Sequence, residues 1–308
     1  MYIGNMEILH CDKYTYLGAV FTADGSTRSS ILEHVADRLK HLNKLIIFFH
    51  TNCDMPFIVK RKVLDAAFNA SLLYGCEAWL DTSVHAVEKL YNSAIKCLLG
   101  VRVTTANDLC LAELGMPPLS ALVRQKQHFF FNKLISERQH MQDDPFMFAI
   151  NLTRHGNPRM RKYLDNLMQN GNHVTGSLNK LRGKICSSSK SKFITYIDLN
   201  PSLGVHNVYK DSSANIPELY RISFSRFRLS SHRLRIETGR WARLPREQRL
   251  CTCSNNEIQD EKHVIENCHL VQHIRVAYPK PALITDVLNK YNDVAAFKFV
   301  HDTLTFYE

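Results

Sequence analysis

The feature that most constrains how this 308-residue chain can fold is a group of three cysteines and one histidine near its C-terminal end. Cys251, Cys253, His263 and Cys268 lie within eighteen residues of one another. Structural zinc takes four such ligands in a tetrahedral arrangement, through thiolate sulfur and imidazole nitrogen. The four residues between His263 and Cys268 match the gap in the second half of zinc fingers. The pattern therefore predicts a structural zinc that staples a C-terminal lobe.

The same cluster has other interpretations. Free cysteine is a common small core residue and histidine is common at surfaces, so the four side chains could be unliganded. The first pair is also C-x-C, whereas the usual first half of a zinc site is C-x2-C. His269 or His273 could replace His263 as the fourth ligand. With His263 as ligand, we expect it on a helix and Cys268 at the helix end, because positions i and i+5 do not share a helical face.

An arginine-rich stretch directly precedes the cluster. Residues 221–249 hold nine arginines against two glutamates, and the whole chain carries a formal net charge of +10. Such an excess favours an anionic partner, most often nucleic acid. If the apolar residues of this stretch face the metal lobe, most of its guanidinium groups point outward together. An ordinary basic surface is the alternative, since charge alone does not exclude it.

Composition bounds the class and the compartment of the protein. Hydrophobic residues make up 45% and charged residues 22%, which is typical of a globular chain. No apolar run approaches the length of a membrane-spanning helix, and residues 1–9 show no secretory signal. The nine cysteines are mostly isolated within apolar helical patterns, which indicates reduced thiols. We therefore expect an intracellular protein, in the nucleus or the cytoplasm.

Apolar periodicity predicts a mainly α-helical fold with a small N-terminal β-hairpin and a zinc-stapled helical C-terminal lobe. Five amphipathic helices are expected, over residues 29–49, 54–75, 83–99, 117–138 and 293–306. The hairpin is expected from strands at residues 7–9 and 14–21, because Asp12 and Lys13 favour a turn between them.

Several segments occur in a specific joint order along the chain. These are Tyr14–Phe21 followed by Asp24-Gly25 and a long helix, Leu73–Trp79, Leu98–Val101, Leu114–Leu119, and an arginine-rich helical pair with the step Ser231-His232 before the cysteine cluster. This order resembles the C-terminal part of the reverse transcriptase of non-LTR (LINE-type) retrotransposons, an RNA-directed DNA polymerase. The resemblance covers residues 7–140 and 216–276, and it strengthens the expectation of zinc.

The resemblance implies a division into four domains. They are the end of a palm with a primer-grip-like hairpin (1–26), a helical thumb-like domain (27–140), a helical connector (141–215) and an arginine-rich lobe with the Cys/Cys/His/Cys cluster (216–308). In such a polymerase the hairpin holds the primer end, and the thumb grips the duplex through phosphate and sugar contacts.

That role implies RNA and DNA as partners, as template–primer duplex or target DNA, together with an upstream polymerase domain. The residues expected to bind nucleic acid are Tyr16, Leu17, Gly18, Lys60, Arg61, Lys62, Arg226, Arg228, His232, Arg233, Arg235 and Arg240. A solvated helix face is the alternative for the basic residues among them.

No catalytic residue is identified in the sequence. Polymerase chemistry needs paired aspartates that hold two metal ions, and the family carries them in an aromatic-x-Asp-Asp motif before the hairpin. The one Asp-Asp pair here, Asp143-Asp144, precedes Pro145 in a polar loop, a context typical of a helix cap or turn. We therefore do not expect this chain to polymerise alone.

Three other possibilities stay open. The chain could be a helical protein–protein interaction module with an incidental basic surface, or a domesticated relic without enzymatic activity. It could also be an enzyme subunit that a palm domain completes in trans. Salt dependence separates phosphate binding from an apolar interface, because only phosphate contacts weaken steeply with salt.

Overall fold

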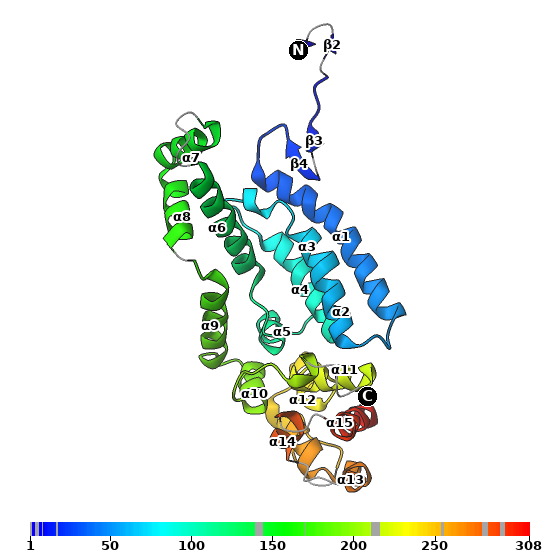
Figure 1. Ribbon diagram of the computed structural model, residues 1–308. Helices are drawn as coiled ribbons and strands as arrows, with labels where there is room; N and C mark the ends of the chain where they lie inside the picture. Colours follow the sequence, from blue (N-terminus) through cyan, green and yellow to red (C-terminus); the bar gives the residue numbers. More distant parts are fainter. Residues whose placement is uncertain are drawn as a thin grey trace. The chain divides into compact units, whose positions relative to one another are not determined.

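The computed structural model describes residues 2–3, 6–7, 9–16, 18–138, 144–169, 171–210, 216–253, 256–278, 283–289 and 293–308. Within these ranges the chain is mainly helical, with short antiparallel hairpins at its N-terminal end (Figure 1). The predicted mainly α class is thereby confirmed. No described helix combines the length and the apolar character needed to cross a membrane.

The N-terminal strands pair differently from the prediction. The strands are β1 (Tyr2–Ile3), β2 (Met6–Glu7), β3 (Lys13–Tyr16) and β4 (Ala19–Thr22). β1 pairs with β2 and β3 pairs with β4, so the stretch 14–21, predicted as one strand, is itself a hairpin. Gly18 stands at this reversal with a φ of +81°, a left-handed conformation that glycine adopts without steric cost.

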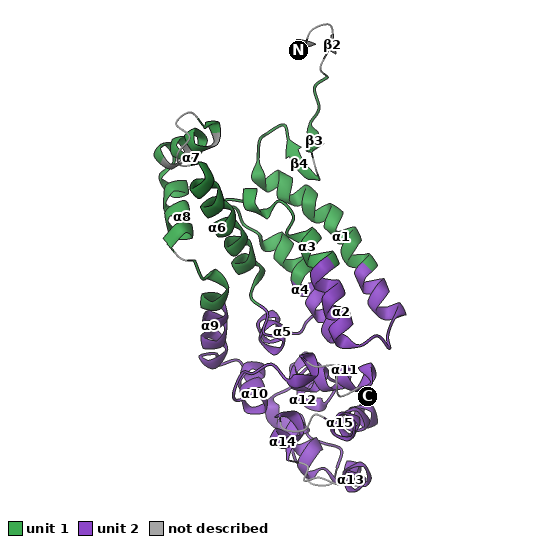
Figure 2. Ribbon diagram, in the orientation of Figure 1, with its two compact units in different colours: residues 1–44, 67–91, 117–177 green, residues 45–66, 92–116, 178–308 purple. Residues whose placement is uncertain are grey.

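The chain divides into two compact units, which are described separately (Figure 2). Unit 1 comprises residues 1–44, 67–91 and 117–177, and unit 2 comprises residues 45–66, 92–116 and 178–308. The α-helices are α1 (Thr27–Thr51), α2 (Phe57–Val63), α3 (Ala70–Leu72), α4 (His85–Leu99), α5 (Asn107–Leu114), α6 (Leu119–Arg138), α7 (Pro145–Gly156), α8 (Pro158–Gln169), α9 (His173–Cys186), α10 (Ser191–Leu199), α11 (Glu218–Arg228), α12 (Arg235–Trp241), α13 (Gln272–Val276), α14 (Ile284–Asn289) and α15 (Val294–Tyr307). Between them lie two π-helical turns, η1 (Leu64–Asn69) and η5 (His263–Asn267), and four 3₁₀ turns, η2 (Cys76–Ala78), η3 (Asn207–Tyr209), η4 (Arg246–Gln248) and η6 (His269–Val271).

Some helix ends follow local rules that the sequence already carries. Asp293 caps α15, because its side chain accepts a hydrogen bond from the Ala296 amide at 2.9 Å. Gly100 follows α4 with a φ of +69°, and a Cβ added there would lie 2.8 Å from Ile222. The predicted helix 54–75 is interrupted, because η1 separates α2 from α3.

One apolar cluster of unit 1 forms where α6 and α8 pack together. Phe131, Leu164 and Leu167 are buried there in one apolar cluster. Gln127 is also buried; its amide donates to the carbonyl of Cys76 at 3.0 Å, and its oxygen accepts from Tyr163 at 2.6 Å. A buried amide with both ends satisfied ties η2, α6 and α8 to one arrangement, because a lost partner would leave a desolvated polar group.

The core of unit 2 forms where α11 packs along α15. The rings of Phe224 and Phe297 have centroids 4.5 Å apart, and Phe227 is fully buried beside them. These apolar residues occupy one face of α11, so the arginines of the same helix have to be placed by other contacts.

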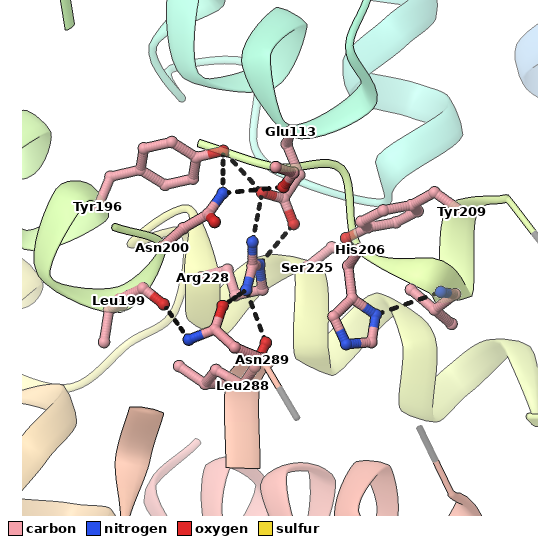
Figure 3. A network of polar contacts seen from close by, with 12 residues as sticks. Glu113, Tyr196, Leu199, Asn200, His206, Tyr209, Ser225, Arg228, Leu288 and Asn289 are labelled. Atoms are coloured by element: carbon pink, nitrogen blue, oxygen red, sulfur yellow. Dashed lines mark hydrogen bonds and ion pairs between the residues drawn. The ribbon is translucent and has the colours of Figure 1, made fainter. Parts of the chain in front are cut away.

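A buried polar network in unit 2 accounts for one of those arginines (Figure 3). Arg228 Nε lies 2.6 Å from Glu113 Oε1, and Arg228 Nη2 lies 3.1 Å from Glu113 Oε2. Tyr196 donates to the same carboxylate at 2.8 Å, while Arg228 Nη1 donates to the carbonyl of Leu288 at 2.7 Å. This fork-to-fork pair joins α5 to α11, and it gives the helix that the sequence did not predict, α5, a defined place in unit 2.

Candidate metal centre and arginine-rich surface

The four residues of the predicted cluster converge in unit 2. Cys251, Cys253, His263 and Cys268 are all buried, and their ligand atoms lie within 4.8 Å of one another. The Sγ atoms of Cys251 and Cys268 are 3.7 Å apart, and Cys253 Sγ is 3.3 Å from His263 Nε2. This arrangement can hold a metal ion.

The local chain brings the first two ligands together in a tight hairpin. Leu250 and Ile258 form an antiparallel bridge, and the Cys251 amide donates to the Glu257 carbonyl at 2.7 Å. The bridge places both cysteines of the C-x-C pair on the connecting loop. A two-residue step is therefore enough here, because the loop rather than a helix sets the direction of each thiol.

The second pair of ligands comes from η5 and the residue after it. The Asp260 carboxylate accepts from the His263 amide at 3.0 Å, which starts the turn. Cys268 follows with an extended backbone, and its amide donates to the His263 carbonyl at 2.8 Å. The prediction of His263 on a helix and Cys268 at its end is confirmed. Because the chain leaves the helical path at Cys268, the thiol of Cys268 can lie in the same cluster as the imidazole.

The spacing fits a tetrahedral metal ion with soft ligands. Metal–sulfur bonds of about 2.3 Å and metal–nitrogen bonds of about 2.0 Å separate two sulfurs by about 3.8 Å, and sulfur from nitrogen by about 3.5 Å. The Glu257 carboxylate lies against His263 Nδ1, so Nε2 faces the cysteines. His269 and His273 are both exposed and lie outside the cluster, which decides in favour of His263 among the three histidines.

Neighbouring polar groups favour the thiolate form. Burial alone would raise the pKa of the Cys251 thiol, but hydrogen bonds from the Cys253 backbone and the Gln259 amide lower it from 9.0 to about 6. Tyr307, from α15, has its hydroxyl 2.9 Å from the Cys268 sulfur, where it can donate to a thiolate. Thiolates bind metal and thiols do not, so the surroundings prepare the site for a cation.

Three of the residues predicted to bind nucleic acid are internal. Arg228 is held by Glu113, as described above, and His232 Nε2 lies 3.0 Å from the buried Glu261 carboxylate. Lys60 is 4% exposed, and its Nζ lies 3.2 Å from Glu218. A buried polar side chain that already has its partner cannot reach a phosphate without breaking that contact. We therefore assign these three a structural role and leave them out of the interface proposed below.

Three further predicted arginines are partly engaged. Arg226 is half-buried and donates from Nε to the carbonyl of Gly100 at 2.8 Å. Arg240 is paired with the buried carboxylate of Glu237 and donates to Ser191. Arg61 is similarly paired with Asp65 on the next helical turn, whereas Lys62 beside it is exposed. Engaged guanidinium groups keep spare N–H donors, but their positions are set by the protein.

Within residues 221–249, three exposed arginines differ from Arg246, which is exposed but paired with Asp260 at 3.0 Å. Arg233, Arg235 and Arg243 make no side-chain hydrogen bond or ion pair with any residue that the structure describes. Two of them use their backbone amides instead. The Arg235 amide donates to the Gln259 side-chain oxygen at 2.8 Å, and the Arg243 amide donates to the Arg240 carbonyl at 3.1 Å. Arg233 and Arg235 were predicted; Arg243 was not singled out, although it lies in the same arginine-rich stretch.

One contact of this surface had no signal in the sequence. The Arg102 guanidinium lies 3.9 Å from the ring centroid of Trp241, which is 49% exposed. The two residues are far apart along the chain, and no spacing or motif links them. The contact arises because α12 follows the Ser231-His232 step, to which Arg102 is hydrogen-bonded.

The predicted N-terminal residues lie in unit 1. Tyr16 is 57% exposed, Gly18 adjoins the ring of Tyr74, and Leu17 lies outside the described residues. A groove of about 400 Å³ runs beside them, and its lining includes Tyr16, Tyr74 and Lys126. Aromatic and basic side chains therefore share this groove, as a nucleic-acid contact would require.

Asp144 of the Asp-Asp pair caps a helix. Its carboxylate accepts from the Met147 amide at 3.1 Å and pairs with Arg138 at 2.7 Å, at the start of α7. Asp143 lies outside the described residues. The predicted cap or turn is thereby confirmed for Asp144.

Comparison with known proteins adds no assignment. Neither a protein-family model nor a curated protein nor a solved structure matches this chain. Function is therefore inferred from the geometry above and from the segments that resemble the LINE-type polymerase.

Proposed function

We propose that this chain binds nucleic acid through a zinc-stapled, arginine-rich lobe. Its place would be that of the thumb and C-terminal segment of a LINE-type reverse transcriptase, which holds template RNA and target DNA. Asp144 takes no catalytic part in this proposal, because it is engaged as a helix cap.

The observation that carries the proposal is how residues 216–253 distribute their charges. Two of the three glutamates in this stretch, Glu218 and Glu237, are buried in internal ion pairs. Arg233, Arg235 and Arg243 are exposed, against a single exposed carboxylate, Glu247. A surface that serves only solubility mixes both signs more evenly, so the excess favours a polyanionic partner.

Zinc is the metal that we propose for the Cys251 cluster. Three thiolates and one imidazole leave no open coordination position, so the ion would cross-link the chain rather than take part in chemistry. It would fix the hairpin at Leu250 and η5 to one another, and Tyr307 would join α15 to them. Binding energies for small structural sites are of order 10 kcal/mol, which is ample to organise the lobe that presents the arginines.

A salt titration tests the nucleic-acid proposal directly. Binding of a labelled nicked duplex and of a structured RNA is measured over a range of salt concentrations for wild type and for Arg233→Ala/Arg235→Ala. We expect nanomolar-to-micromolar affinity with weak sequence preference. Loss of two phosphate contacts should lower the log–log salt slope by about 1.4–1.8.

The matched control is Arg159→Ala/Arg161→Ala, which removes the same charge from α8 in unit 1. Both control arginines are exposed and paired with nearby aspartates. Their loss should leave the slope unchanged. A slope equal in wild type and in the Arg233/Arg235 variant would contradict the proposed interface.

A second candidate function, a helical protein-interaction module, has one observation in its favour. Unit 1 contains an apolar groove of about 580 Å³ whose lining includes Ala78, Leu80, Phe130, Ile150 and Leu164. An amphipathic helix that buried its apolar face there would bind with little salt dependence. Substitution of Phe130 by Asp would weaken such a complex and leave nucleic-acid binding intact, so the two candidates can be separated.

A further inference from the structure

The contact between Arg102 and Trp241 is built as a fixed platform rather than a mobile surface pair. The Arg102 amide donates to the Ser231 hydroxyl oxygen at 2.9 Å, and Arg102 Nη2 donates to the His232 carbonyl at 3.1 Å. Ser231 is itself held by Thr105, whose hydroxyl lies 3.1 Å away, and both are buried. The guanidinium therefore stays over one face of the Trp241 indole, 3.9 Å from the ring centroid.

Trp241 keeps about half of its surface open to solvent. Trp241 ends α12, and almost half of its surface is exposed although one face is covered. Exposed tryptophan is unusual for a side chain that contributes so much apolar area, unless the area serves a contact. The guanidinium over one face also limits the motion of the indole, so less conformational entropy is lost when a flat ring binds to its exposed part.

Positive charges gather around this platform. Burial, followed by the nearby charge of Arg233, lowers the pKa of Arg102, and Arg226 acts in the same direction. Glu237 and Glu308 oppose the effect, but Glu237 is already engaged by Arg240 and Lys192. Like charges held together without full compensation favour an anion from solution.

We propose that Trp241 and Arg102 form a stacking site for one unpaired nucleotide, with Arg233 beside it for a phosphate of the same strand. This inference rests on the proposed nucleic-acid binding and specifies its substrate as a strand with at least one unstacked base. Bases inside a duplex have both faces occupied, so only a single strand, a loop, a nick or an unpaired overhang can offer an unpaired base. The stack itself does not depend on the sugar, so RNA and DNA strands are both candidates.

Fluorescence gives a direct readout, because the chain has only two tryptophans and the other, Trp79, is 7% exposed in the core of unit 1. Single-stranded RNA, single-stranded DNA and a blunt duplex of equal charge are titrated into wild type and into Trp241→Phe. A single strand should quench the fluorescence of Trp241 in the wild type. It should cause no such quenching in Trp241→Phe, which keeps only Trp79. The blunt duplex should not, and comparison of the two single strands shows whether a 2′-hydroxyl matters.

Affinity measurements with Trp241→Ala complete the test. Loss of one base–aromatic stack should weaken single-strand binding roughly fivefold to 150-fold, while Trp241→Phe keeps most of the affinity. The salt slope should stay unchanged in Trp241→Ala, since no phosphate contact is lost, whereas Arg233→Ala should lower it. Unchanged metal content and circular dichroism in Trp241→Ala show that the fold is intact.

The outcomes separate the two levels of the proposal. Equal single-strand affinity in wild type and Trp241→Ala, with a steep salt slope in both, would overturn the stacking site and leave the arginine surface standing. Quenching by the blunt duplex as strong as by the single strand would also overturn it. Absence of any nucleic-acid binding would overturn both the stacking site and the proposed function.

Discussion

Replacing Glu113 by leucine should destabilise unit 2 strongly, because Glu113 is fully buried and paired with Arg228. The substitution removes the carboxylate that lies 2.6 Å and 3.1 Å from the two guanidinium nitrogens of Arg228. Both residues are at most 1% exposed, so water cannot replace the lost partner. Arg228 would keep only its contacts to Leu288 and Asn289, and Tyr196 would lose its acceptor.

The magnitude follows from leaving a guanidinium buried without its counter-ion. Breaking one side of a buried ion pair costs about 3–5 kcal/mol. The Tyr196 hydroxyl also loses its acceptor, so we expect a loss of stability in the upper part of that range. Removing both charges together, in Glu113→Leu/Arg228→Met, should recover most of the loss, since no buried charge is left and the introduced Leu and Met are similar in volume to the residues they replace. The expected pattern is one costly single variant and a milder double variant.

Urea unfolding followed by circular dichroism measures both effects. Wild type, Glu113→Leu and the double variant are compared at neutral pH, with exposed Arg233→Ala as the control, for which we expect a change within about 0.5 kcal/mol. A loss below about 1 kcal/mol in Glu113→Leu, or a double variant at least as unstable as the single one, would refute the reasoning.

Three further results are expected. One zinc per chain should co-purify and be lost in Cys268→Ser and His263→Ala but not in His269→Ala; metal analysis showing equal zinc in all variants would exclude the site. Burial, followed by the charge of Arg228, lowers the pKa of His206 from 6.5 to about 4, so the folded state favours the neutral ring. His206 should therefore contribute stability above pH 6.5 that is lost as the pH falls toward 4. His206→Asn should flatten that part of a profile of unfolding free energy against pH. Purified protein should not extend a primer with Mg²⁺ and nucleotides, while Asp144→Ala should lower stability by about 1 kcal/mol through loss of a helix cap; primer extension abolished by Asp143→Ala would contradict our interpretation of this pair.

Local chemistry in the sequence was enough to predict the residues of the candidate metal cluster and the long amphipathic helices. The spacing of Cys251, Cys253, His263 and Cys268 restricts where the chain can turn, and the apolar stripes restrict which faces are buried. Gly100 and Asp293 mark helix ends through their own backbone and side-chain preferences. These features depend on neighbours a few residues away, so they can be read from the order of residues alone.

The N-terminal hairpin shows where local patterns were ambiguous. A run of β-favouring residues from 14 to 21 has the composition of one strand, and only the φ of Gly18 turns it into two. The alternation of side chains does not reveal this reversal, because each half is short enough to suit either arrangement.

The fate of each arginine was decided by tertiary structure. The local sequence does not distinguish the arginines between 221 and 249 from one another. In the structure, however, Arg228 is buried against Glu113, Arg240 is paired with Glu237, and Arg233 is exposed. Glu113 precedes Arg228 by 115 residues, so no local rule could place its carboxylate there. A charged side chain goes to the interior only where a distant partner offsets its desolvation, and that partner becomes known only when the whole chain is folded.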